Sequence, residues 1–273
     1  MTDAAMLRIP GGRILVGSDA HYAEERPARD IDVPPFWIDR AAVTKAEFAE
    51  FVAQTGWITS AEKTATPGSP VFRMTSGPVD LRDPAQWWAF AEGVNWSCPN
   101  GLGTGLAGLE DHPVVHVARS DAEAFAAWRG ARLPSEWEWE AACRGGLRGA
   151  AYAWGDEFSP NGELPANIWS GSFPWYFARD GKPGTCAVDR YPPNGYGLLG
   201  MIGNVWEWTS SAYEGRGCCG SATSRHQQLT ALRGGSYLCA AEYCQRYRPA
   251  ARIGVEAGTT TGHIGFRCAR GET

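Results

Sequence analysis

Apolar residues recur at helical spacing in three segments of this chain, and each segment starts with a Ser or Thr followed three positions later by Glu. The segments are residues 44–55, the stretch that opens at Ser120 and stops at Gly130, and residues 135–143. In the first, Phe48, Phe51 and Val52 share one helix face. At each start the hydroxyl can accept a hydrogen bond from a free backbone N–H while the Glu reaches back, a reciprocal cap worth about 1 kcal/mol. The pattern predicts three short, capped helices.

Strand patterns are shorter, and they lie far apart in the chain. They cover residues 13–16, 114–117 and 264–268, so any sheet is expected to be mostly antiparallel or mixed. Residues 64–109 are rich in Gly, Pro and Trp with weak periodicity, which is typical of a long irregular segment that is functional or well packed. No repeat or linker divides residues 1–273. The pattern predicts an α+β fold in a single compact domain with low regular secondary structure.

Composition narrows the class of protein. The 34 Gly and 18 Pro among 273 residues imply many turns, and 13 Trp can provide packing that long elements would otherwise supply. A net charge of −5 argues against nucleic acid as a partner, because phosphate binding needs a basic face. The N-terminus has no basic start followed by an apolar run, and no apolar run approaches membrane-spanning length. We therefore expect a cytoplasmic protein without membrane contact.

Two of the eight cysteines form the most informative pair. Cys239 and Cys244 are five residues apart, so on an extended strand they would lie roughly 16 Å from each other, and they converge only if the segment turns. Paired thiolates select soft ions such as Cu(I) or Zn(II), and two thiolates without a nearby His or third Cys suit low-coordinate Cu(I) better than tetrahedral Zn(II). From spacing alone, an inert buried pair and a disulfide stay open as alternatives.

Several motifs resemble the formylglycine-generating enzymes of the sulfatase-modifying factor family, in their bacterial form. They occur in the family's order over nearly the whole chain, at residues 9–12, 36–39, 78–83, 111–116, 132–140, 166–169, 192–198, 203–209 and 265–268. A single motif of this kind would mark only the wider superfamily. The pair Cys239 and Cys244, preceded by Arg-Gly-Gly-Ser at 233–236, is similar to the catalytic pair of the aldehyde-forming members. The resemblance implies this family's loop-rich, C-type-lectin-like fold.

The resemblance also implies an active site. Cys239 and Cys244 would hold one copper ion as Cu(I), and a substrate cysteine would join as a third sulfur. Family positions imply catalytic roles for Ser236 and Trp206. They imply substrate-binding roles for Tyr243, Arg248 and His263, the last of which stands where several members have Asn. Core packing or a surface ion pair remains an alternative for the two aromatic residues and for Arg248.

Calcium is the second implied cofactor. The family's first Ca²⁺ site corresponds to side-chain oxygens of Asn167 and Asp180 and backbone carbonyls of Ile168 and Lys182, and its alternative is a plain turn. A second, less supported site corresponds to Gly200, Gly203, Val205 and Glu207. Gly200 stands where the family has Asn or Asp, so we expect this site to be weak or empty.

The remaining cysteines are interpreted as thiols, with one open case. Cys143 and Cys268 occupy positions that look like a disulfide pair in secreted members of the family, whereas a reducing cytosol favours two thiols. Both states stay open here. Cys98, Cys186, Cys218 and Cys219 have no assigned role.

Three functions compete. The first, favoured by the resemblance, is a copper-dependent oxidoreductase that acts on a cysteine in an unfolded or exposed Cys-x-Pro-x-Arg segment of a sulfatase. With O₂ as acceptor and a thiol reductant, loss of a Cβ hydrogen would give a thioaldehyde that hydrolyses to Cα-formylglycine, which activates the sulfatase. The second is an iron sulfoxide synthase, which needs a His-rich helical domain that 273 residues with five His do not supply. The third is a non-enzymatic binding module, and a small-molecule thiol oxidase is a variant of the first. We expect a monomer.

Overall fold

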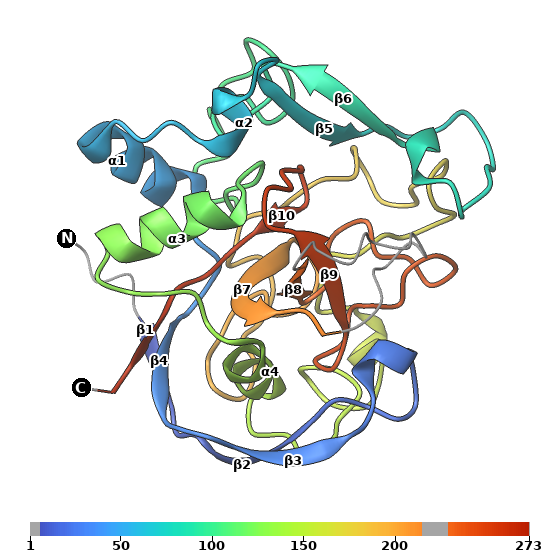
Figure 1. The fold of residues 1–273 in the computed structure, drawn as a ribbon. Helices are drawn as coiled ribbons and strands as arrows, with labels where there is room; N and C mark the ends of the chain where they lie inside the picture. The colour runs from blue at the N-terminus through green and yellow to red at the C-terminus, as the bar shows by residue number, and fades with distance from the viewer. Residues whose placement is uncertain (1–5, 215–228, 273) are drawn as a thin grey trace.

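A mixed four-stranded sheet forms the centre of the molecule. The computed structural model describes residues 6–214 and 229–272 (Figure 1). The strand order is β10-β7-β8-β9, in which β10 runs parallel to β7 and the other neighbours are antiparallel. The four strands are β7 (Trp206–Ala212), β8 (Leu229–Arg233), β9 (Arg252–Glu256) and β10 (Ile264–Gly265). The predicted mixed sheet is thus confirmed within the described residues.

Smaller sheets surround this centre. A three-stranded antiparallel sheet joins the two ends of the described chain in the order β1-β4-β11, with β1 (Met6–Ile9), β4 (Phe36–Asp39) and β11 (Ala269–Gly271). Two hairpins pair β2 (Gly12–Val16) with β3 (Arg29–Val33) and β5 (Gly68–Phe72) with β6 (Trp88–Glu92). Three short 3₁₀ turns lie at Ala23–Glu25, Pro84–Gln86 and Pro160–Gly162.

Two of the predicted helices begin and end as their caps require. Helix α1 (Lys45–Thr55) starts at Thr44, whose Oγ1 accepts from the Glu47 amide at 3.2 Å while Glu47 Oε2 accepts from the Thr44 amide at 2.8 Å. Helix α4 (Glu136–Arg144) starts at Ser135 with the same reciprocal bonds to Glu138. A single turn, α2 (Ser60–Lys63), follows α1. The capping-box prediction is confirmed for α1 and α4.

The predicted start of the middle helix is wrong. Helix α3 spans Arg119–Trp128, so Ser120 and Glu123 lie inside it. The buried carboxylate of Asp121 reaches back and accepts from the Ala118 amide at 2.9 Å, which caps the helix two residues before the predicted start. Asp121 also accepts from the Trp57 indole, so the same carboxylate ties α3 to the segment after α1. Glu123 instead pairs with Arg119 on the surface.

Two of the three strand predictions also need correction. Residues 13–16 lie within β2, as expected. Residues 114–117 form no strand, because His116 has a left-handed backbone with φ 61°, which interrupts the extended conformation. Its amide makes an isolated hydrogen bond to the Thr261 carbonyl. The strand expected over 264–268 ends at Gly265. The irregular segment at 64–109 contains the β5–β6 hairpin.

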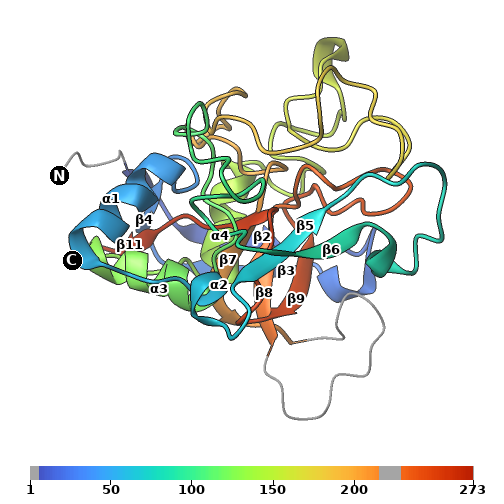
Figure 2. The same cartoon turned by 90° about the horizontal axis from the view of Figure 1, so that it is seen from above.

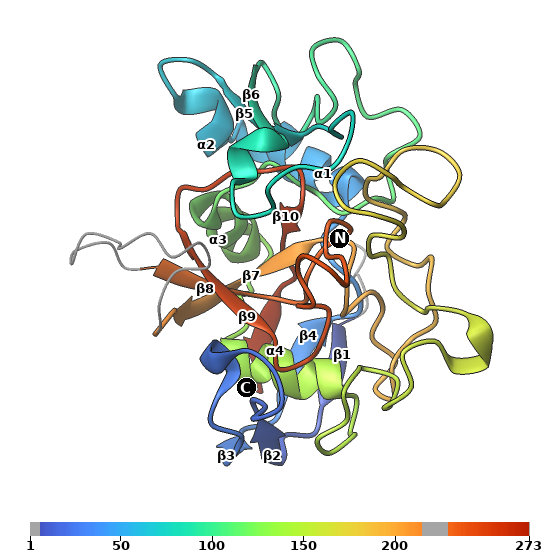
Figure 3. The ribbon, with the colours of Figure 1, turned by 90° about the vertical axis from the view of Figure 1, so that its right-hand side faces the viewer.

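Helix α4 links the central sheet to the β2–β3 hairpin, and α1 packs on α3 at the other end (Figure 1). Phe48 of α1 stacks on Phe125 of α3 with ring centroids 5.8 Å apart, and Phe266 meets both rings edge-on. The segment between α4 and β7 forms a wide irregular layer beside the sheet (Figure 2; Figure 3). None of the described helices is both long and apolar enough to cross a membrane. One compact unit of low regularity results, as predicted.

Candidate active site

The two predicted cysteines meet in the loop that follows β8. Within this loop the Cys239 amide donates to the Ser236 carbonyl at 2.9 Å and the Cys244 amide donates to the Ala240 carbonyl at 2.8 Å, so the chain turns twice. These turns bring the two Sγ atoms to 3.2 Å, well beyond the bond length of a disulfide, about 2.05 Å. The convergence that the spacing required is confirmed, and the pair is present as two thiols.

A glycine next to the pair makes room for it. Gly235 has φ 74°, and a Cβ at this position would lie 2.7 Å from the Arg246 carbonyl and 3.3 Å from Cys239 Sγ. A side chain would therefore be strained in its backbone and would collide with the far arm of the loop. The Gly-Gly-Ser sequence before Cys239 thus sets how closely the two arms approach.

The two thiols have opposite protonation tendencies. Burial, followed by the neighbouring Cys244, raises the pKa of Cys239 well above its usual range. The hydrogen bond from Cys239, assisted by the positive charge of Arg246, lowers the pKa of Cys244 to about 7 against the effect of burial. As the pH rises through neutrality Cys244 therefore ionises before Cys239, and the singly ionised pair keeps one proton with the negative charge on Cys244. Cys244 is the more exposed of the two.

Buried ion pairs fix the strand from which the loop emerges. Arg233, the last residue of β8, is fully buried and donates to Glu140 of α4 and to the Pro249 carbonyl at 2.6 Å. Arg252, the first residue of β9, pairs with Glu136 of α4 at 2.8 Å. Both ends of the segment between β8 and β9, here called the cysteine loop, are thereby anchored to helix α4. The motif at 132–140 supplies these carboxylates.

An aromatic wall stands beside the pair. Tyr243 stacks on Phe173 with ring centroids 4.6 Å apart and an interplanar angle of 1°, and Trp87 packs edge-on against Tyr243 at 5.2 Å. The Phe173 amide donates to the Glu242 carboxylate at 2.6 Å. The Trp169 amide donates to the Cys239 carbonyl at 3.0 Å. The irregular layer at 169–173 is therefore attached directly to the cysteine loop.

Three other predicted residues lie in the core around the loop, and one of them, Ser236, contacts Cys239. Ser236 is fully buried; its amide points at Cys239 Sγ at 3.5 Å and its Oγ accepts from the Leu238 amide. Trp206 packs in the same buried cluster as Cys239, and its amide donates to the His263 carbonyl at 2.9 Å. The His263 ring packs against Trp88 at a tilt of 36° and hydrogen-bonds to Thr261, and burial lowers its pKa to about 3, so the ring is neutral.

Arg248 lies at the far end of the loop and is fully engaged. Its Nη1 and Nη2 atoms donate to the two carboxylate oxygens of Glu25 at 2.7 Å and 2.5 Å, and its Nε donates to the Gln245 carbonyl. Both side chains of the ion pair are buried. This geometry gives Arg248 an anchoring role, and its contact with substrate stays a prediction.

The donor set at the pair suits a soft ion of low coordination number. The described residues contain no cluster of three or more His, Cys, Asp or Glu side chains that could hold a metal. Two thiols, one of them ionised near neutral pH, therefore lack the extra donors that tetrahedral Zn(II) requires, but they fit Cu(I).

The first predicted calcium site is compatible with the structure. Asn167 is buried, and its Nδ2 donates to the Gly184 carbonyl at 2.9 Å, which brings Gly184, two residues after Lys182, next to Asn167. Among the described residues no donor bonds to the Asn167 Oδ1 or to the exposed Asp180 carboxylate. These oxygens carry no hydrogen-bond donor in the described residues and are of the type that Ca²⁺ prefers, so the donor chemistry fits Ca²⁺.

The second predicted calcium site does not fit. Glu207 is buried, its Oε2 accepts from the Trp139 indole at 2.6 Å and from Arg267 at 2.7 Å, and its Oε1 accepts from Arg267 at 2.8 Å. The charge that a cation would use is already neutralised by a guanidinium. Gly200, Gly203 and Val205 add no side-chain oxygen that could replace it.

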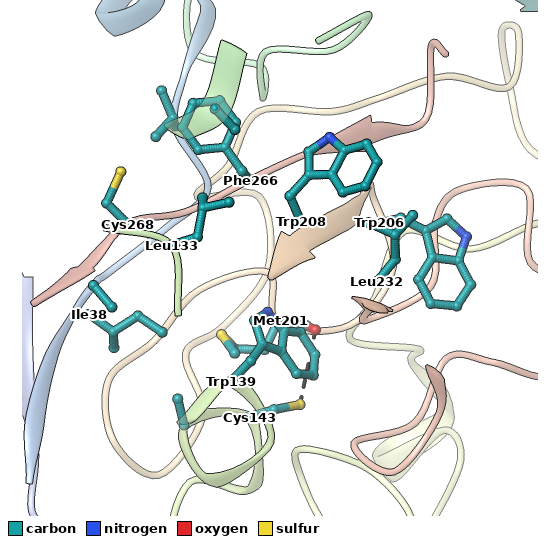
Figure 4. Close-up of a cluster of buried hydrophobic side chains, with 14 of the residues drawn as sticks. Ile38, Leu133, Trp139, Cys143, Met201, Trp206, Trp208, Leu232, Phe266 and Cys268 are labelled. Atoms are coloured by element: carbon teal, nitrogen blue, oxygen red, sulfur yellow. Dashed lines mark hydrogen bonds between the residues drawn. The ribbon is translucent and has the colours of Figure 1, made fainter. Parts of the chain in front are cut away.

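Cys143 and Cys268 form no disulfide in this structure. Cys143 lies beside Trp139 and Met201, whereas Cys268 lies near Leu133 (Figure 4). The two side chains point into different parts of the core, and burial raises the pKa of both thiols. Cys98 and Cys186 are partly buried free thiols. Cys218 and Cys219 lie outside the described residues.

Some residues of the site were missed from the sequence. These residues are Arg246, Phe173 and Glu25. Each contacts the loop or its side chains, and the positions of Phe173 and Glu25 in the sequence give no sign of this role. Only the position of Arg246, two residues after Cys244, could have suggested a cation near a thiolate.

The chain is similar in sequence and in fold to known proteins. The model of the "Sulfatase-modifying factor enzyme 1-like domain" family matches residues 1–272. A Mycobacterium tuberculosis protein named formylglycine-generating enzyme is 46% identical, over 96% of this chain and 96% of its own length. A Mus musculus protein named inactive C-alpha-formylglycine-generating enzyme 2 is 41% identical, over 98% of this chain and 86% of its own. The solved structure of PvdO from Pseudomonas aeruginosa matches with a TM-score of 0.65 at 22% identity, over 98% of this chain and 94% of that one, which shows the fold alone.

Proposed function

We propose that this chain, which belongs to the sulfatase-modifying factor enzyme 1-like family, is an enzyme that converts a cysteine of a sulfatase to Cα-formylglycine. The target would be a cysteine in a Cys-x-Pro-x-Arg segment, with O₂ as acceptor and copper as cofactor. The observation that carries the proposal is the 3.2 Å contact between the Sγ atoms of Cys239 and Cys244.

Identity to relatives does not decide the activity. Relatives named as enzymes and relatives named as inactive match this chain at similar identity, 46% and 41% in the two cases above. The argument therefore depends on the thiol pair, since a binding module has no need of two converging thiols with opposed protonation. Cys244, ionised near neutral pH, would bind a soft ion first, and Cys239 would lose its proton as the ion binds.

The residues around the pair have separate tasks in this proposal. Bound copper would supply O₂ activation next to a substrate thiolate. The buried Cys239 limits access from the core side, so substrate approaches from the side of Cys244. Tyr243 and Phe173 form a rigid apolar wall against which an extended segment with a proline can lie. Ser236 and Gly235 hold Cys239 in place through the turn.

The first test is a panel of peptides assayed by mass spectrometry. With Cu(I), O₂ and a thiol reductant, a Cys-x-Pro-x-Arg peptide should show the mass loss of thiol-to-aldehyde conversion. Replacing its Pro or its Arg by Ala should reduce kcat/KM at least about tenfold, or about 1.4 kcal/mol of transition-state stabilisation. Equal oxidation of free cysteine and of scrambled peptides would instead identify a small-molecule thiol oxidase, and no conversion of any peptide would favour a binding module.

We further propose that Asn167 and Asp180 bind Ca²⁺ together with the carbonyls of Ile168 and Lys182. A cation that binds only the folded chain stabilises it by mass action, so chelation should lower the Tm. The Asp180→Ala variant should be insensitive to chelator, and the matched control Asp156→Ala should respond as the parent does. Identical melting curves of the parent protein with and without chelator would contradict the proposal.

A further inference from the structure

A second cleft lies away from the thiol pair. It has a volume of about 740 Å³, within the size range of small-molecule sites, about 300 to 1,000 Å³. Its walls come from the β5–β6 hairpin, the 99–101 turn, the 182–185 segment and the start of α1. Tyr237 lines it, whereas Cys239 and Cys244 do not. The cleft is therefore distinct from the proposed catalytic pair, although Lys182, whose carbonyl belongs to the proposed calcium site, also lines it.

The cleft contains a buried lysine without a counter-ion. Lys45 is 1% exposed and lines the cleft, yet no carboxylate of the described residues lies within ion-pair distance of it. Burial lowers the pKa of His112 and His116, and the positive charge of nearby Lys45 adds to this effect at both rings. A buried unpaired ammonium is costly, and its place as the first residue of α1 adds the unfavourable positive end of the helix dipole. A bound anion would remove both costs.

The other charged residues that line the cleft also favour an anionic ligand. Arg73 and Lys182 are exposed on its rim, and Glu92, also exposed, is its one carboxylate in the described residues. Burial lowers the pKa of His116 to about 4, so this ring is neutral at pH 7. Tyr237 is kept protonated because burial raises its pKa. Three cations thus face one anion across a cavity whose remaining walls are partly apolar.

We propose that this cleft binds a small organic carboxylate, with Lys45 as the buried partner of the carboxylate group. Arg73 and Lys182 would meet a second carboxylate at the rim, and Val94, Leu109 and Val115 would contact the carbon chain between them. The volume of about 740 Å³ and the apolar part of the wall favour an organic ligand over a bare inorganic ion.

Calorimetric titration of the full chain tests the proposal. The probes are acetate, which has one carboxylate, and the dicarboxylates malonate, succinate and glutarate, in which the carbon chain between the carboxylates becomes longer. All four chelate calcium weakly. At least one dicarboxylate should bind the parent protein. Lys45→Met should weaken that binding at least tenfold, whereas Lys63→Met, which removes an equal charge away from the cleft, should leave it unchanged. Absence of binding by all four probes, or equal binding by Lys45→Met, would overturn the proposal.

Two further readouts do not depend on ligand binding by the Lys45→Met variant. Burial lowers the pKa of Lys45 to about 8. Binding to the parent should therefore weaken at least tenfold between about pH 7 and about pH 9.5, and the Lys182→Met variant should keep this pH dependence. Without ligand, Lys45→Met should melt at a higher temperature than the parent, because it removes an unpaired buried charge. A lower Tm together with pH-independent binding would make Lys45 a structural residue and would refute the inference.

Discussion

At the scale of single residues, the sequence predicted which thiols meet but not how they share protons. The spacing of Cys239 and Cys244 required a turn, and the turn is present. The protonation depends on three features that spacing does not encode, namely the burial of Cys239, the 3.2 Å contact and the charge of Arg246. Arg248 shows the same limit, because its buried partner Glu25 lies 223 positions away in the chain.

The thiol pair should therefore react asymmetrically with an alkylating reagent. Because the pKa of Cys244 is lowered to about 7, its rate of alkylation by iodoacetamide should rise with pH and level off above about pH 8. Cys239, whose pKa is raised, should react only slowly over this range. Peptide mapping of the metal-free protein gives both rates. The Cys239→Ala variant removes the hydrogen-bond donor and should shift the Cys244 profile toward higher pH; an unchanged profile would show that the contact does not control ionisation.

At the scale of elements, the capping pattern predicts a helix start correctly where the capping hydrogen bonds that it implies form in the structure. Ser135 and Thr44 cap α4 and α1 as the Ser/Thr-x-x-Glu pattern predicts. At α3 the same pattern at Ser120 was overridden by Asp121, whose carboxylate is held by Trp57 and Ser60 from another segment. The apolar run at 114–117 forms no strand for a related reason, because its backbone amides donate to two separate segments, at Val43 and at Thr261.

Two serines with the same sequence pattern should therefore differ in their effect on stability. Ser135→Ala removes a real cap and should lower the free energy of unfolding by about 1 kcal/mol. Ser120→Ala changes a residue inside α3 and should cost less than half of that. Urea unfolding of the two variants measures the difference. Equal losses would mean that Ser120 has a capping role that the α3 geometry does not give it.

At the scale of the whole molecule, the family motifs mostly build the frame that holds the loop. Glu140 pairs with Arg233, Glu136 with Arg252 and Glu207 with Arg267, all of them buried. Each pair joins segments that are at least 60 positions apart. Such partners cannot be assigned from one sequence, although the α+β class, the single domain and the loop-rich character could. The cleft around Lys45 likewise emerges only when α1, the β5–β6 hairpin and the 182–185 segment come together.

The central claim is that Cys239 and Cys244 act together as the catalytic pair, and turnover of one peptide by three variants tests it most directly. Purified parent protein, Cys239→Ser, Cys244→Ser and the control Cys98→Ser are loaded with Cu(I), and aldehyde formation on a Cys-x-Pro-x-Arg peptide is followed by mass spectrometry. The account predicts that either Ser variant of the pair loses turnover by orders of magnitude and no longer retains copper, because a protonated hydroxyl replaces a soft thiolate, while Cys98→Ser behaves as the parent. Full turnover by folded Cys244→Ser would contradict it.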